Sequence, residues 1–75
     1  MPTWITYKNH QIKACSQYLE GDRWLPMALV WLSVGHPESL TLIHGALSEI
    51  CNTEYKANVI ALDKAKNWVD QQSIG

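Results

Sequence analysis

The hydrophobic pattern is strongest at residues 23–33, where nine apolar residues follow Arg23 without a charge. Turn signals bound this run on both sides, Gly21-Asp22 before it and Gly35-His36-Pro37 after it. Its length and its two tryptophans predict a strand at the centre of a small sheet. Alternation places Leu25, Met27, Leu29 and Trp31 on one face, and Trp24, Pro26, Ala28, Val30 and Leu32 on the other. Both faces are apolar, so both require cover.

Two further strands are predicted before this central strand, at residues 4–7 and 11–19. Asn9 tolerates the left-handed backbone of a tight hairpin turn, and Glu20-Gly21-Asp22 supplies the second turn. The second strand alternates between an inward set (Ile12, Ala14, Ser16 and Tyr18) and a solvated set (Lys13, Cys15 and Gln17). This alternation is typical of a sheet with one packed face.

Pro26 lies inside the central strand, although proline cannot donate a hydrogen bond to a ladder. Its missing N–H can face an open edge or a bulge, or the pairing can begin after it. The strand has to pair with a neighbour on each side, so we expect a bulge at Pro26.

Residues 40–50 fit two structures. Leu40, Ile43, Leu47, Ile50 and Cys51 recur at helical spacing, and Pro37-Glu38 would suit a helix start. A helix would place Gly45 in its middle at a cost of about 1 kcal/mol, whereas Thr41-Leu42-Ile43 favours extended backbone. Periodicity alone does not choose between helix and strand.

The last segment predicts a helix over residues 52–72. Asn52-Thr53 offers an N-cap side chain, and Glu54 adds a negative charge in the first turn. One helical face carries Ala57, Ala61, Leu62, Ala65, Trp68 and Val69. We expect Ala61, Ala65 and Trp68 to face the sheet and to meet Ile12, Trp24 or Val30.

Residues spread over most of the chain resemble a class of small bacterial proteins of unassigned function. The matching positions are Tyr7, Ile12, Gly21, Arg23, Trp24, Pro26, Thr53, Ala57, Ala65, Trp68, Val69 and Asp70. Asn9 stands where that pattern has glycine, and Asp22 is inserted between Gly21 and Arg23. The resemblance implies a β-meander followed by one helix, and it favours a fourth strand at residues 40–50. The element order is similar to that of double-stranded-RNA-binding-like domains, an analogy that leaves function open.

We therefore expect a single α+β domain, an antiparallel three- to four-stranded β-meander with one C-terminal α-helix packed on one face. Six basic against seven acidic residues give a net charge of −1, which provides no attraction to nucleic acid or an anionic membrane. No apolar run approaches the roughly 18–20 residues of a membrane span. The first residues lack a basic segment followed by an apolar one, so we expect a cytoplasmic protein with Cys15 and Cys51 reduced; a disulfide is the alternative.

The side chains suited to metal binding or nucleophilic catalysis are His10, His36, His44, Cys15 and Cys51. No pair has zinc-finger or His-x-x-x-His spacing, and nothing marks an oxyanion hole for a Cys51–His44 pair. The acidic residues are scattered, and there is no glycine-rich phosphate loop. We expect no enzymatic activity, no metal and no cofactor.

One helix covers one face of a sheet, so the candidate interface is the other face of the central strand, with Leu25, Met27, Leu29 and Trp31. A homodimer covers this face most simply, and a different protein partner is the second possibility. The alternative function is a nucleic-acid-binding domain of double-stranded-RNA-binding-like topology. That function requires basic residues around the sheet aromatics, and the sequence places only Lys13 and Arg23 there.

Overall fold

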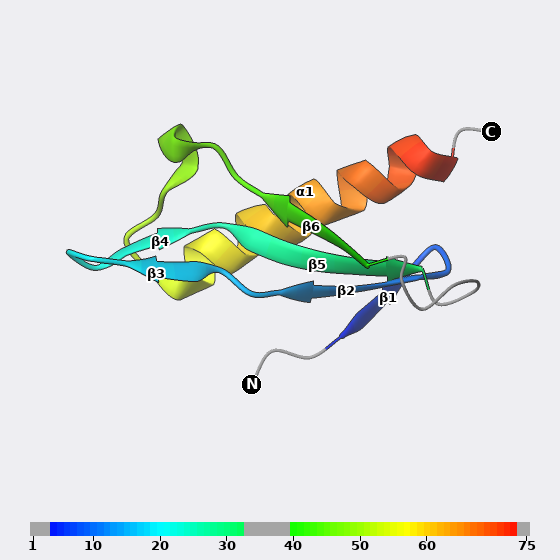
Figure 1. Ribbon diagram of the computed structural model, residues 1–75, viewed down its shortest axis with the longest axis horizontal. Coiled ribbons are helices and arrows are strands. Elements are labelled where there is room, and N and C mark those ends of the chain that lie inside the picture. The colour runs from blue at the N-terminus through cyan, green and yellow to red at the C-terminus, as the bar shows by residue number, and fades with distance from the viewer. Residues whose placement is uncertain (1–3, 33–39, 74–75) are drawn as a thin grey trace.

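The computed structural model describes residues 4–32 and 40–73, so the turn expected at Gly35-His36-Pro37 lies outside the described residues. Its strands and helices follow one another along the chain as six strands, a short 3₁₀ helix and one long helix (Figure 1). Their bounds are β1 (Ile5–Tyr7), β2 (His10–Ala14), β3 (Gln17–Leu19), β4 (Arg23–Leu25), β5 (Met27–Leu32), β6 (Leu40–His44), η1 (Leu47–Glu49) and α1 (Glu54–Ser73).

The main sheet is a four-stranded antiparallel meander in the order β1-β2-β5-β6, and β3 pairs with β4 in a second, two-stranded sheet. Helix α1 runs diagonally behind the strands (Figure 1). This architecture confirms the predicted α+β class with four strands and one C-terminal helix. The fourth strand is shorter than residues 40–50, because β6 ends at His44 and Leu47 begins the 3₁₀ helix.

Both hairpin turns have the left-handed backbone that their residues tolerate. Lys8 and Asn9 join β1 to β2 with φ values of 48° and 66°, the two positive values typical of a type I′ turn. At the second turn Gly21 and Asp22 have φ values of 76° and 56°. The predicted hairpin positions are therefore confirmed.

The bulge expected at Pro26 is wrong. Ala14 pairs with Ala28, and Gln17, three residues later, pairs with Leu25, three residues earlier than Ala28. The register therefore does not change across the proline. Strands β3 and β4 are thus the far end of one long hairpin formed with β2 and β5. The Cys15 N–H donates to the Met27 carbonyl, so the backbone groups of Met27 point towards this hairpin partner. Because backbone groups alternate in direction along a strand, the nitrogen of Pro26 points the other way, and its missing N–H does not interrupt the hairpin.

The irregularity lies instead in the neighbouring strand. Gly45 N–H donates to the Pro26 carbonyl at 2.8 Å, but proline has no N–H to return the bond. The chain leaves the sheet after Gly45 and returns at Cys51, which exchanges two hydrogen bonds with Trp24. A Cβ on the buried Gly45 would lie 3.2 Å from the Pro26 ring, so this close approach favours glycine.

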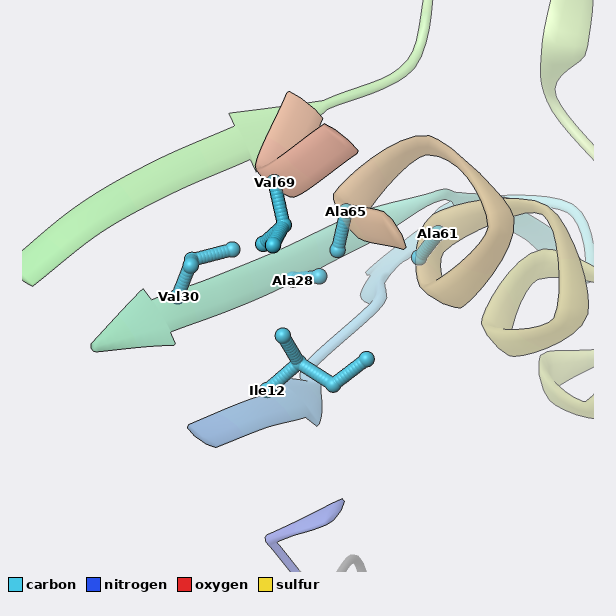
Figure 2. Packing of buried hydrophobic residues seen from close by; sticks show 6 residues of the cluster. All are labelled: Ile12, Ala28, Val30, Ala61, Ala65 and Val69. Atoms are coloured by element: carbon cyan, nitrogen blue, oxygen red, sulfur yellow. The ribbon is translucent and has the colours of Figure 1, made fainter. Parts of the chain in front are cut away.

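The core lies between α1 and the sheet. Thr53 Oγ1 accepts a hydrogen bond from Lys56 N–H and caps the helix, as predicted. Alanines at four-residue intervals let the helix backbone lie close to the strands. Figure 2 shows six buried core residues from β2, β5 and α1: Ile12, Ala28, Val30, Ala61, Ala65 and Val69. The predicted helix face is confirmed, with Trp68 packed against this cluster, whereas Trp24 lies outside it and packs edge-on against Tyr18.

A polar cluster ties the β1–β2 turn to the C-terminal half of α1. Tyr7 Oη–H donates to Asp70 Oδ1 at 2.9 Å, and Lys8 Nζ donates to the same oxygen at 2.6 Å. The hydrogen bond from Lys8, followed by that from Tyr7, holds the pKa of the Asp70 carboxyl below its usual value. These contacts hold the β1–β2 hairpin against the C-terminal half of α1.

Candidate functional site: the open face of the sheet

The two faces of the central strand have different surroundings. Ala28 and Val30 are buried beneath α1, with exposed fractions of 0% and 1%. Because side chains alternate along a strand, Met27, Leu29 and Trp31 lie on the opposite face. We call this side of the four-stranded sheet the open face, since α1, the long helix of the described chain, packs on the other side.

Three of the four predicted interface residues share the open face. Met27, Leu29 and Trp31 lie on β5 and are half-buried by their neighbours on β2 and β6. Leu25 is also half-buried but lies on β4, beyond the four-stranded sheet, where it pairs with Gln17. Leu25 therefore lies next to the other three on the same side of the long hairpin, but beyond the four-stranded sheet.

Sequence reasoning missed the most exposed apolar residues of this face. Leu40 and Leu42 on β6 are 52% and 49% exposed, and they pair with Trp31 and Leu29 respectively. Residues paired directly across antiparallel strands lie on the same face, so the four side chains are neighbours. The alternation of β6 was the available signal, but it becomes readable only when residues 40–44 are known to be a strand.

The open face is apolar over β5 and β6 and becomes polar towards β1 and β2. Gln11 Nε2 donates to Thr6 Oγ1 at 2.9 Å. Lys13 Nζ lies 5.6 Å from the centre of the Trp4 ring, within the range of a cation–π contact. Trp4 is 44% exposed and extends the apolar surface to this polar side. An apolar centre with polar groups at its border is the usual arrangement of a protein-binding surface.

The two cysteines are the possible nucleophiles of the described chain. Cys15 and Cys51 are free thiols. Burial raises the pKa of the Cys15 thiol, which keeps it protonated and weakens it as a nucleophile. The Cys51 thiol donates to the Glu49 carbonyl at 3.3 Å. Within residues 4–32 and 40–73, no three His, Cys, Asp or Glu residues are grouped in a way that could hold a metal ion.

The described part of the chain contains no helix of the length and apolarity needed to cross a membrane. Comparisons with protein-family models, with curated proteins and with solved structures found no match to this chain.

Proposed function

We propose that this chain is a non-enzymatic protein-interaction module that acts as a homodimer through its open face. The observation that carries the proposal is the row of apolar side chains on β5 and β6, of which Leu40 and Leu42 are about half exposed. Contiguous apolar surface of this kind is uncommon on monomers and usually marks an interface. The free thiols also fit a protein of the reducing cytoplasm.

A second copy is the partner that this surface favours. Two sheets can pack face to face with their strands nearly aligned, and a two-fold axis then brings each apolar row against its own copy. No charged side chain lies among Met27, Leu29, Trp31, Leu40 and Leu42, so these apolar rows can meet without repulsion, with Lys13 beside them on β2. The polar residues near β1 would lie at the border of such a contact.

Nucleic acid remains the weaker alternative. Lys13 is the basic residue that the strand register places on the open face within the described chain. At the hairpin tip, Arg23 Nε already donates to the Glu20 carbonyl. Binding to a phosphate backbone depends on several cations acting together, and this surface offers few.

The experiment compares Trp31→Lys with Val59→Lys by sedimentation velocity and circular dichroism. Val59 is 50% exposed on the outer side of α1, so it receives the same change away from the open face. We expect Trp31→Lys to give a folded monomer, because each charge would meet its own image across the two-fold axis. Val59→Lys should remain a dimer.

A parent protein that stays monomeric at about 100 μM, a concentration that saturates any contact of micromolar affinity, contradicts the homodimer. A monomeric parent that binds RNA or DNA at physiological salt, with affinity falling steeply as salt rises, would support the alternative.

A further inference from the structure

Strand β6 forms one edge of the sheet, and within the described chain no strand pairs with its outer side. Backbone N–H and C=O groups point alternately to the two sides of a strand. Because Gly45 N–H donates to Pro26, the backbone groups of Ile43 and Thr41 also point towards β5. The N–H and C=O groups of Leu42 and His44 therefore point outward. The strand reads Leu-Thr-Leu-Ile-His and carries neither the lysine nor the proline that commonly blocks an exposed edge.

A groove lies between this edge and α1. Its hollow, of about 280 Å³, is lined by residues of β6 and α1, whereas a second hollow of about 350 Å³, also lined by Trp68, extends over Val30 and Leu32 of β5. Ile43 lines the first hollow, and Thr41 lines the second. These two residues are alternate positions of β6 and lie on the face of the strand that α1 covers. A strand added to β6 would direct every second side chain towards this groove.

Polar side chains that can donate hydrogen bonds line both hollows, together with apolar residues such as Ile43 and Trp68. Lys64, Asn67 and Gln71 of α1 line the first hollow together with His44, whereas His10 and Gln72 contribute to the second. Neither lining includes a carboxylate. Lys64 Nζ binds Glu49 Oε1 at 3.0 Å, but an ammonium group has three donors and can bind a second acceptor.

We propose that the outer edge of β6 binds an extended peptide of a partner protein as a fifth strand, with acidic side chains directed into the groove and apolar side chains beside Leu40 and Leu42. The backbone bonds would supply strand pairing, and the alternating side chains would supply selectivity. The acidic side chains of the peptide would accept hydrogen bonds from the groove, and its apolar side chains would extend the apolar surface of the open face. This site borders the proposed dimer contact at Leu40 and Leu42, but its hydrogen bonds come from the outer backbone edge of β6, which the face-to-face contact does not use.

The Lys64 ammonium, which keeps donors beyond its bond to Glu49, favours a peptide with carboxylates over a second copy at this edge. A second β6 strand would bring Thr41 and Ile43 to the groove, and neither carries a carboxylate for the donors of Lys64, Asn67 and Gln71. Residues of a partner that alternate apolar and acidic side chains satisfy both sides of the added strand.

The test uses a fluorescein-labelled heptapeptide of sequence Val-Glu-Val-Glu-Val-Glu-Val and measures fluorescence anisotropy. The protein variants are Leu42→Pro and Leu42→Ala. Both remove the leucine side chain, but only proline removes the outward N–H, and this N–H does not take part in the β5–β6 ladder. The matched peptides replace every Glu by Lys, or carry N-methyl groups on every Val. The second peptide blocks pairing without any change to the protein, in case Leu42→Pro does not fold.

We expect saturable binding of the Val-Glu peptide, weakened at least about tenfold by N-methylation, by the change of Glu to Lys, and by Leu42→Pro relative to Leu42→Ala. Absence of binding to the parent protein overturns the proposal, as does equal binding of the N-methylated peptide. If Leu42→Pro separates a dimer that Leu42→Ala preserves, a second copy occupies the edge, and this result also overturns it. The Trp31→Lys experiment reports on the open face alone, so the failure of one proposal is distinguishable from the failure of the other.

Discussion

The two faces of β5 have almost the same hydrophobicity but opposite surroundings. On the helix-covered face, small residues such as Ala28 oppose Ala61 and Ala65, and all three are buried. On the open face, Leu29 and Trp31 are larger, but Leu42 beside Leu29 is about half exposed. Small side chains thus bring the helix close to the sheet, whereas larger ones form a surface without a partner within the described chain.

The difference shows that residue size, and not hydrophobicity alone, indicates which face a helix covers. A helix lies close to a sheet only where its contact residues are short, and the alanines of α1 supply that stripe. Close packing then leaves little room for change on the covered face. Within the described residues no helix packs on the open face, so its larger side chains are not limited by such a close approach.

The largest expected loss of stability comes from a charge placed on the helix-covered face. Ala61 is 1% exposed, and Ala61→Glu would bury a carboxylate among Ile12 and Ala28 without a partner. We expect a loss of about 3–5 kcal/mol in the free energy of unfolding, measured by urea denaturation. The control is Val59→Glu on the exposed side of the same helix, which should change stability by no more than about 0.5 kcal/mol. If the two variants are equally stable, the covered face has been assigned to the wrong residues.

The sequence predicts the helix, the hairpin turns and the division of β5 into two faces. These features rest on local signals, namely the four-residue spacing of alanines, the left-handed residues of the turns and strand alternation. The predicted helix at residues 52–72 differs from the observed Glu54–Ser73 by one or two residues at each end.

The features that sequence reasoning missed depend on contacts between distant segments. Pro26 keeps its register because the missing N–H falls on the side of Gly45, and nothing local to Pro26 indicates which side that is. Asp70 lies 63 positions from Tyr7, and its partners could not be paired before the fold was known. The apolar residues of β6 remained hidden because residues 40–50 fitted both a helix and a strand.

A smaller loss of stability is expected when the polar cluster of Tyr7, Lys8 and Asp70 is removed. Asp70→Asn removes the carboxylate that binds Lys8 and Tyr7, so the parent should be more stable than the variant at neutral pH. The folded-state pKa of Asp70 is lowered, so its contribution is present above the usual pKa of 3.8 and is lost as pH falls through the lowered value. The stability difference should therefore shrink in acid. All three side chains are accessible to solvent, which keeps the effect modest.

Thermal denaturation of the parent and of Asp70→Asn, followed from neutral pH to below 3.8, measures this difference. The same hydrogen bonds raise the pKa of Tyr7 and of Lys8, so the contribution should also be lost in strong alkali as these groups deprotonate. A difference that is constant across the acid range would mean that the Asp70 carboxylate does not stabilise the fold through its charge.

The smallest expected effect concerns the open face within a single chain. Leu42 and Ile43 are neighbours on β6, but Leu42 is 49% exposed on the open face and Ile43 packs against the core cluster. At a protein concentration low enough to give monomers, Leu42→Lys should change the free energy of unfolding by no more than about 0.5 kcal/mol, because the side chain is already about half exposed and a lysine there can keep its ammonium in water. Ile43→Lys should cost more, since it replaces apolar contacts with α1 by a charge. Because the two positions are adjacent on the same short strand, the comparison reduces effects of strand propensity and fraying. A large loss for Leu42→Lys at low concentration would show that the open face is covered by its own chain, and the surface proposed for dimerisation would not be available.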